Sequence, residues 1–591
     1  MDRTKTKERI GRTAFMIAAT VCVLAVAAIF VFLIAQSIPA FSKIGLGEFL
    51  FGQEWSPDRT DTFLSNPLSG SYGVLTMAVG SLAATLGALL FGGITGYFTA
   101  VFLVFFCPKK LKKPLGFVVD LLAGIPSVVY GYFGITCLLP VLALFAPNNG
   151  TGLLATSLVL GIMLLPTVVS ISKTSMEAVP KSYYEGAVAL GATHEKAVFK
   201  TVVPAARSGV TASLVLGVGR ALGETMAVVM VAGNSPAFPN GLFLSFRVLT
   251  ANIVLEMGYA GELQEGALVA TGVVLLFFVF LVNLAFFALS SHRKKEGTTR
   301  GRRLKEWRGN IAHRLHAETL GKIAAYTAGG VTGTALLAIV GFVLVKGVPH
   351  LSKDLLFGAF EFAGGKVTVL PALVATLMTV ALSLLIAVPL GVMTAIFLVE
   401  YAPKNNRAVR LIRGAIDVLS GVPSIVYGLF GMITFVKIFG GTGSVLAGSL
   451  TVSIMLLPTI VRATEESLQS VADTLRAGSF ALGAGKMRTI FKVVLPSAAS
   501  GVLSAVILSI GRVIGESAPF LYTMGSVIKA IPKSYLDGGA TLSVALYQLS
   551  GEGWHTNEAF ATAVVLVLLV ITLNLLAELI AGRIRKKING R

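Results

Sequence analysis

The sequence predicts an all-α polytopic membrane protein made of two related six-helix halves. The chain of 591 residues is 54% hydrophobic and only 13% charged, with a mean hydropathy of +0.81. It contains many apolar runs close to the roughly 20 residues that cross a bilayer as a helix. Motifs of the first half recur in the second half in the same order. A chain with so little polar surface does not suit a soluble globule of this size.

Twelve apolar segments are expected to span the membrane, six in each half. The first follows the basic start MDRTKTKERIGR. Its apolar run of about 23 residues is too long for the core of a cleaved signal peptide, so we interpret it as an anchor. The expected spans are 14–36, 73–106, 115–142, 153–172, 210–232 and 266–290, then 324–345, 371–400, 414–436, 447–461, 501–525 and 559–582.

The distribution of basic residues predicts the orientation. The formal net charge of +20 raises the question of nucleic-acid binding, and the positions of the basic residues along the chain indicate a different reason for the charge. If the N-terminus is cytoplasmic, the segments that face the cytoplasm hold 38 of the 49 Lys and Arg. This is the positive-inside pattern of a multi-pass protein of a bacterial-type inner (plasma) membrane. We therefore expect both termini in the cytoplasm, the lipid bilayer as surroundings and no nucleic acid as partner.

The two halves are related copies. The motif IMLLPT occurs at 162–167 and 454–459, and ALGA follows it in each half at the same offset of 292 residues. Both halves start inside, so they are expected to be parallel repeats about an axis along the membrane normal. The predicted divisions are a first half at 1–290, a basic cytoplasmic linker at 291–323 and a second half at 324–591. The linker is interpreted as a solvated connector near anionic lipid, with a regulatory ligand site as the alternative.

Two arginines are the only basic residues left inside the expected spans. Arg220 lies in GRALGET and Arg512 in GRVIGES, each four residues before a glutamate, Glu224 or Glu516. A charge near mid-bilayer is costly unless it faces the bundle interior or a water-filled cavity, and such residues are usually functional. We therefore predict that these four residues line a substrate pathway. The alternative is that each pair, at i and i+4, neutralises itself and holds helices together.

The residue types also suggest the chemistry of the substrate. The guanidinium fork suits bidentate binding of an oxyanion. Phosphate near neutral pH keeps one or two protons and can donate a hydrogen bond to a carboxylate, whereas sulfate cannot and would be repelled. Arginine together with glutamate therefore favours a protonated oxyanion.

Proline-containing motifs recur in the third span of each half. AGIPSVVYG contains Pro126 and SGVPSIVYG contains Pro423, and each proline removes a helical hydrogen bond. The motifs indicate either a helix break that exposes polar groups to the pathway or close helix packing, and both alternatives stay open. Asp120 and Asp417 are expected to start helices. The residues assigned to pathway or packing are Pro126, Ser127, Tyr130, Pro423, Ser424 and Tyr427.

The connection between the fourth and fifth spans predicts a cytoplasmic helix pair in each half, at 177–209 and 469–501. In the first half the pattern is a short helix, a glycine turn, a second short helix and a stop at a proline. It resembles the coupling loop of ABC importer permeases, in which a Glu-Ala-Ala motif precedes a glycine. The matching residues are Glu185, Gly186, Ala187, Gly191 and Pro204, then Ala477 in place of the glutamate, Gly478, Gly483 and Pro496.

The chain shows no sequence pattern for nucleotide or metal binding. The nearest candidate for a phosphate-binding loop, GGKV at 364–367, lacks the first glycine and the final hydroxyl residue. The three cysteines, Cys22, Cys107 and Cys137, have no CxxC spacing and are interpreted as small hydrophobic residues. We therefore expect no metal, no catalytic residue and no cofactor bound by this chain. A coupling loop without a nucleotide site implies a separate ATPase that holds ATP and Mg²⁺.

Together the AGIPSVVYG/SGVPSIVYG, IMLLPT, ALGA and GRALGET/GRVIGES motifs resemble the transmembrane permeases of phosphate-specific ABC importers. The first half is similar to one permease subunit and the second half to its partner. The resemblance implies a type I importer fold, two ATP-binding subunits on the cytoplasmic side, an extracytoplasmic phosphate-binding protein and alternating access. The alternatives are a permease for sulfate, molybdate or another oxyanion, and a secondary transporter driven by an ion gradient.

Overall fold

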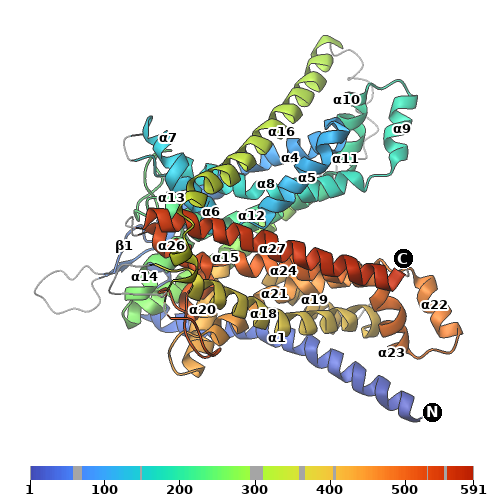
Figure 1. The fold of residues 1–591 in the computed structure, drawn as a ribbon. Helices are drawn as coiled ribbons and strands as arrows, with labels where there is room; N and C mark the ends of the chain where they lie inside the picture. The colour runs from blue at the N-terminus through green and yellow to red at the C-terminus, as the bar shows by residue number, and fades with distance from the viewer. Residues whose placement is uncertain are drawn as a thin grey trace, which may run out of the picture. The chain divides into compact units, whose positions relative to one another are not determined.

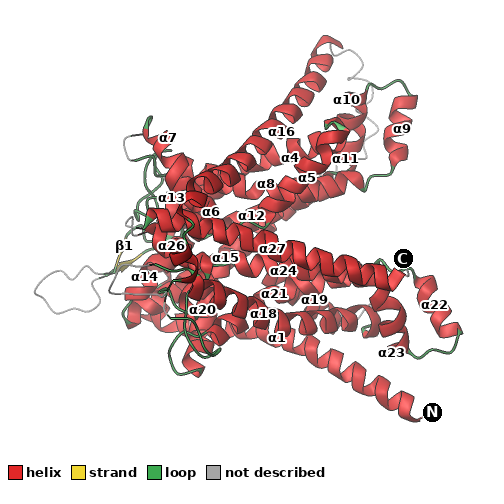
Figure 2. Cartoon of the chain, viewed as in Figure 1, coloured by secondary structure: helices red, strands yellow, loops and turns green. Residues whose placement is uncertain are grey.

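The computed structural model describes residues 2–57, 70–146, 149–292, 311–358, 367–403, 407–528, 530–551 and 555–589. The chain is almost entirely helical over these residues (Figures 1 and 2). Two short strands, β1 (Trp55–Ser56) and β2 (Ser71–Tyr72), pair antiparallel, with Trp55 opposite Tyr72. The candidate phosphate loop at 364–367 and most of the linker at 291–323 lie outside the described residues.

Helical segments divide between two compact units. Unit 2 comprises residues 44–258 and 274–345, and unit 1 comprises 1–43, 259–273 and 346–591. The helices from residue 44 to residue 347 are α2 (Leu46–Phe51), α3 (Leu75–Ala88), α4 (Ile94–Val101), α5 (Lys109–Ala123), α6 (Ser127–Phe133), α7 (Leu139–Ala143), α8 (Leu153–Glu177), α9 (Lys181–Ala189), α10 (His194–Ala197), α11 (Val203–Ala205), α12 (Arg207–Gly223), α13 (Met226–Val231), α14 (Leu249–Glu256), α15 (Glu262–His292) and α16 (Ile311–Gly347).

The remaining helices belong to unit 1, which also contains the first residues of α15, and they repeat the same order. They are α1 (Asp2–Ile44), α17 (Lys353–Phe357), α18 (Leu370–Ile396), α19 (Arg407–Ser420), α20 (Ser424–Gly431), α21 (Val445–Gln469), α22 (Asp473–Ala481), α23 (Lys486–Thr489), α24 (Leu495–Gly515), α25 (Ala518–Thr523), α26 (Leu542–Gly551) and α27 (Thr556–Asn589). Short π-helical segments join several of them, for example between α4 and α5 and between α23 and α24.

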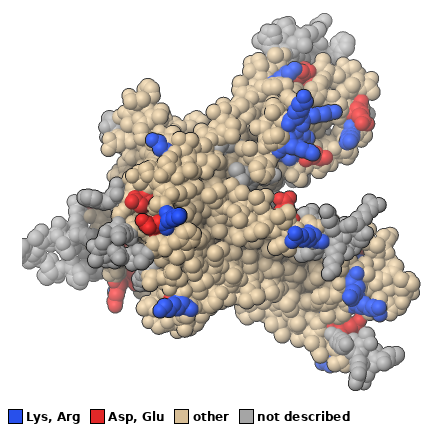
Figure 3. Space-filling model, in the orientation of Figure 1, with Lys and Arg blue, Asp and Glu red and all other residues tan. Residues whose placement is uncertain are grey.

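The helices confirm the all-α membrane fold. Among the described residues, 9 helices are long and apolar enough to span a bilayer, or up to 11 if each strongly bent pair counts as one span. The expected span at 115–142 is not one continuous helix, because α5 ends at Ala123 and a shorter apolar stretch runs over Ser127–Ala143. On the face drawn in Figure 3, Lys and Arg cluster over the end of unit 2 that carries α9 and α10, and the adjoining helix surface is almost uncharged.

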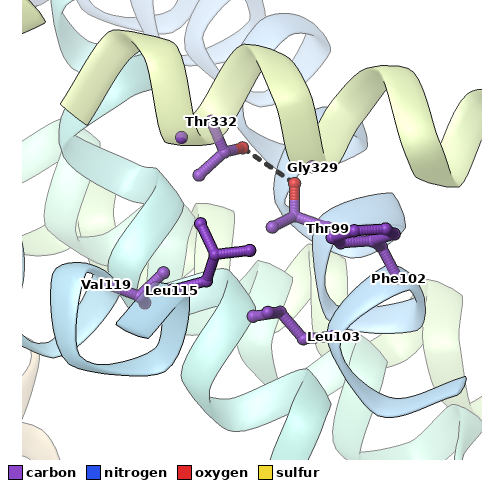
Figure 4. Close-up of a pocket in the computed structure, with 8 residues that line it drawn as sticks. Thr99, Phe102, Leu103, Leu115, Val119, Gly329 and Thr332 are labelled. Atoms are coloured by element: carbon purple, nitrogen blue, oxygen red, sulfur yellow. Dashed lines mark hydrogen bonds between the residues drawn. The ribbon is translucent and has the colours of Figure 1, made fainter. Parts of the chain in front are cut away.

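The first helix of each half packs in the unit formed by the other half. In unit 2, Thr99 and Thr332 share a buried hydrogen bond of 2.8 Å between their hydroxyls, which joins α4 to α16 (Figure 4). In unit 1, the Cys22 thiol of α1 lies 3.3 Å from the Thr394 hydroxyl of α18. Hydropathy alone does not show against which helices a span packs. The packing of α1 and α16 with the opposite halves was therefore not predicted. The division into halves at 1–290 and 324–591 stays a prediction, because it describes which parts of the sequence are duplicated. The two units describe instead which helices pack together.

Small residues allow α16 to pack closely against the helical segment around Phe102 in unit 2. A Cβ atom at Gly329 would lie 2.5 Å from the ring of Phe102, so the glycine leaves the space that the ring fills (Figure 4). Gly333 lies one turn further along, and this spacing is typical of closely packed membrane helices. The GxxxG pattern therefore marks the contact face of α16.

Candidate functional site

The fifth span of each half is broken at its glutamate. Helix α12 ends at Gly223, and Glu224 follows in an extended conformation with φ −71° and ψ 135°. Glu516 takes the same place between α24 and α25, with φ −79° and ψ 138°. The expected spans at 210–232 and 501–525 are therefore not single continuous helices, because each helix ends three residues after its arginine.

At each break a neighbouring hydroxyl group donates a hydrogen bond to the backbone carbonyl of the glutamate. The Thr250 hydroxyl donates to the backbone carbonyl of Glu224 at 2.9 Å. The Ser543 hydroxyl donates to the backbone carbonyl of Glu516 at 2.6 Å. Irregular backbone at membrane depth is tolerated only where its polar groups find protein or water as partners, since an unpaired group costs several kcal/mol. In both units the protein therefore satisfies the backbone carbonyl at the break.

Both predicted arginines are held by a threonine of the fourth span. Arg220 Nη1 donates to Thr167 Oγ1 at 2.8 Å, and Arg512 Nη1 donates to Thr459 Oγ1 at 2.9 Å. A guanidinium carries five N–H donors. Within the part of the chain that the structure describes, the bond to Thr167 is the one hydrogen bond that Arg220 donates. Most of its fork therefore has no acceptor among the described residues.

The predicted glutamates have different partners in the two units. In unit 2 the Glu224 carboxylate accepts hydrogen bonds from the Ser127 side chain and, at 3.4 Å, from the Ala227 amide. Among the described residues it forms no ion pair with Arg220. In unit 1 the Arg512 Nε and the nearer Glu516 carboxylate oxygen are 3.8 Å apart, a long ion-pair distance. The structure thus does not show the self-neutralising helical pair in unit 2.

The third span breaks at the predicted prolines. Pro126 and Pro423 both have extended backbone, with ψ near 145°, and helices α6 and α20 begin at the following serines. The hydroxyl of Tyr130 reaches back across the break to the carbonyl of Leu122 at 2.9 Å. Tyr427 makes the equivalent bond to the carbonyl of Leu419 at 2.8 Å. Each tyrosine therefore adds a hydrogen bond across the break to a carbonyl that already accepts one from the backbone N–H three residues further on.

The same motif also packs closely against its neighbours. Each third span therefore combines a helix break with close helix packing. A Cβ atom at Gly131 would lie 2.6 Å from the Met230 sulfur and 3.0 Å from the Ala227 Cα. A Cβ atom at Gly428 would lie 3.0 Å from the Pro519 Cα. The segment after each third-span break thus presses against the segment after the fifth-span break of the same unit.

The prediction that Asp120 and Asp417 start helices is wrong. Both lie in the last turn of a helix, because α5 and α19 begin well before them and end at Ala123 and Ser420. In unit 1, Asp417 forms an ion pair with Arg462 of α21. The physical reason is the proline after each helix, which ends the helix shortly after the aspartate.

The fourth-to-fifth connections form the predicted helix pairs. Helix α9 carries Glu185, Gly186 and Ala187 and has no buried residue, and the same is true of α22, which carries Ala477 and Gly478. The glycine turns are real, since Gly191 has φ +82° and Gly483 has φ +78°. The chain continues through Pro204 in α11 before a bend of 67°, whereas it passes Pro496 without a strong bend.

Different side-chain contacts hold the two helix pairs of the fourth-to-fifth connections in place. In unit 2 the Tyr184 hydroxyl lies 2.8 Å from Nδ1 of His194, and Nε2 of His194 lies 3.2 Å from the Phe105 carbonyl oxygen. In unit 1, Arg476 bonds Glu400 at 2.9 Å and two backbone carbonyls. Arg476 takes the place of Tyr184 at an offset of 292. The two connections therefore have the same backbone shape but are held by different side-chain contacts.

Comparison with known proteins decides the family. The family model described as "Binding-protein-dependent transport system inner membrane component" matches residues 88–295 and 387–590. The chain belongs to this family. The double match confirms the expected resemblance to ABC importer permeases with both permease parts fused in one chain, and with the helices it indicates a multi-pass protein of the inner membrane. The family comprises membrane transport components.

Relatives of this permease come from several bacteria. A Mycoplasma pneumoniae protein named phosphate transport system permease protein PstA homolog is 29% identical over 81% of both chains. A probable ABC transporter permease protein, YqgH of Bacillus subtilis, is 40% identical over 48% of this chain and 91% of its own. The phosphate transport system permease protein PstC of Mesorhizobium japonicum is 35% identical over 42% of this chain and 80% of its own.

Several polar residues of the permease were missed from the sequence. Thr167 and Thr459 end the IMLLPT motif, so the repeat was seen but its bond to the arginines was not. Asn283 and Asn574 lie in the sixth spans, each with a buried Oδ1 that has no partner among the described residues. Amide side chains within apolar spans are a readable signal, because polar groups in membranes are costly and often functional.

Proposed function

We propose that this permease is the transmembrane subunit of an ATP-driven phosphate importer, which passes inorganic phosphate from an extracytoplasmic binding protein to the cytoplasm by alternating access. The names of the relatives support phosphate. The observation that carries the proposal is the state of the arginines. Each donates a hydrogen bond to a threonine, Arg512 also lies at a long ion-pair distance from Glu516, and the helix ends three residues after each arginine. A guanidinium with most of its donors unused at a break is prepared for an anionic ligand.

The glutamates complete the recognition of a protonated oxyanion. An oxygen of phosphate accepts hydrogen bonds from Arg220 or Arg512, and a phosphate proton is donated to the carboxylate of Glu224 or Glu516. Sulfate has no proton to donate near neutral pH, so its oxygens would face the carboxylates with unfavourable charge. In this proposal the carboxylates select the protonated anion and the arginines supply the attraction.

The coupling segments transmit movement from a partner ATPase. Their tips expose apolar side chains in both units, with Leu190 92% and Leu482 91% exposed. An exposed leucine beside a rigid glycine turn suits docking into a groove of another protein. We propose paired ATP-binding subunits at these tips, with ATP and Mg²⁺ held by those subunits, and a cytoplasmic location for both termini, in line with the basic residues near α9 and α10. The departure at Ala477 predicts unequal coupling of the two units.

Transport in proteoliposomes tests the proposal. The permease, reconstituted with its ATP-binding subunits and a phosphate-binding protein, is expected to take up phosphate only when ATP is supplied on the coupling side and the binding protein on the other. Sulfate and molybdate are expected to compete weakly. Equal competition by sulfate would assign the permease to another oxyanion. Uptake that follows an ion gradient without ATP would support a secondary transporter and contradict the proposal.

A further inference from the structure

We propose that Thr167 and Thr459 are part of the anion site itself, each accepting a hydrogen bond from its arginine and donating its own hydroxyl proton to the oxyanion. The proposal rests on the proposed function and adds two residues that the arginine and glutamate motifs do not include. It begins with the direction of the observed bonds. In both units the guanidinium donates and the threonine hydroxyl accepts, so the hydroxyl proton is still available.

Other hydroxyls in the same helices use that proton differently. Thr156 in α8 donates to the carbonyl of Gly152 at 2.9 Å, and Thr451 in α21 donates to the carbonyl of Ala447 at 2.8 Å. Such a bond to the carbonyl four residues earlier is the usual outcome for threonine within a helix. Among the described residues, neither Thr167 nor Thr459 has a protein acceptor for its proton.

The surroundings make an unused donor significant. Thr167 and Thr459 are only partly buried, and each follows a proline within its helix, Pro166 or Pro458. The neighbouring guanidinium also has donors that find no acceptor in the described part of the chain. A hydroxyl and a guanidinium side by side, both with free protons and both within spans of the membrane, form a cluster of donors that suits several oxygens of one anion. The repetition of the arrangement in both units shows that it is not an accident of one side chain.

The threonine also fixes the arginine. A long side chain with one anchored nitrogen keeps its fork in a narrower range of orientations, so less order has to be imposed when the anion binds. Removing the hydroxyl therefore removes a donor to the anion and releases the guanidinium at the same time. Both losses weaken anion binding in the same direction.

The experiment measures anion binding by the purified permease–ATPase complex. Inorganic phosphate is titrated, and its apparent affinity is taken from the rise in melting temperature. Thr167→Val and Thr459→Val keep the shape of the side chain but lack the hydroxyl. Each is expected to weaken the apparent affinity about tenfold or more, as for the loss of a hydrogen bond to a charged group. Thr167→Ser, which keeps the hydroxyl, is expected to stay within about threefold of the unchanged protein.

Matched controls exclude a general effect of removing a hydroxyl. Thr156→Val and Thr451→Val lie in the same helices and remove hydroxyls that bond their own backbone, so anion affinity is expected to be unchanged. The proposal is overturned if Thr167→Val binds phosphate as well as Thr156→Val does, or if Thr167→Ser is as weak as Thr167→Val. Melting temperatures without phosphate must agree among the variants, which separates anion binding from folding.

A double change separates direct contact from positioning. If Thr167 touches the anion, Thr167→Val weakens binding further in a protein that already carries Arg220→Lys. If it acts only through the guanidinium fork, the double variant binds as Arg220→Lys alone, and the contact with the anion is refuted. Sulfate is titrated in parallel. An unchanged permease that prefers sulfate refutes phosphate as the substrate, and the variants are then compared with sulfate, so the two failures are distinguishable.

Discussion

The glycine turn in each coupling segment gives the sharpest test of how the permease is driven. Gly191 has φ +82°, and a Cβ atom added to it would meet no atom beyond its immediate neighbours within 4 Å. Any effect of substitution therefore comes from backbone conformation. An ordinary L-residue in this region costs roughly 1–2 kcal/mol, which changes the population of the turn by about 5- to 30-fold. Asparagine tolerates the conformation better, and proline cannot adopt it.

A graded series follows from this geometry. Gly191→Asn is expected to retain most of the substrate-stimulated ATP hydrolysis of the assembled complex, Gly191→Ala to lose part of it, and Gly191→Pro to abolish it. The amount of complex in the membrane serves as the control for insertion. Gly483, with φ +78°, is expected to follow the same order with a different size of effect. Normal stimulation in Gly191→Pro would refute the assignment of this segment as the ATPase contact.

Two further predictions concern packing and orientation. Gly329→Ala is expected to lower the stability of the permease by about 1–3 kcal/mol through overpacking against Phe102, seen as a lower melting temperature, whereas Gly330→Ala has open space and serves as the matched control. Equal melting temperatures would contradict the close contact of α16 in unit 2. A cysteine introduced by Thr299→Cys in the linker is expected to react with an impermeant label only from the cytoplasmic side, and labelling from outside would overturn the orientation.

Sequence patterns predict the parts of this fold that depend on local chemistry. The apolar runs predict the spans, and Gly191 and Gly483 mark turns because only glycine adopts their φ angles readily. Spacing did not predict the break at Glu224, since arginine and glutamate four residues apart look the same on a continuous helix. The break depends on the Thr250 hydroxyl, which is distant in sequence and satisfies the released carbonyl.

Tertiary choices account for the other differences. The apolar faces of α1 and α16 suit any membrane helix, so hydropathy does not reveal that each packs with the opposite half. The Thr99–Thr332 bond and the Cys22–Thr394 contact fix that choice, and they become visible only when residues 233 and 372 positions apart are brought together. The bond between Thr167 and Arg220 was hidden for the same reason, because the two residues lie 53 positions apart.

The central claim is that the arginines serve the transported anion and not the folded structure. Phosphate uptake by reconstituted Arg220→Gln and Arg512→Gln permeases tests it most directly, with the melting temperature and membrane amount of each variant measured beside it. We expect uptake to fall close to background while both controls stay near those of the unchanged protein, because a neutral side chain does not offset the cost of bringing an anion to mid-bilayer depth. Retained uptake in either variant, or loss of uptake only in step with loss of folded protein, would contradict the claim.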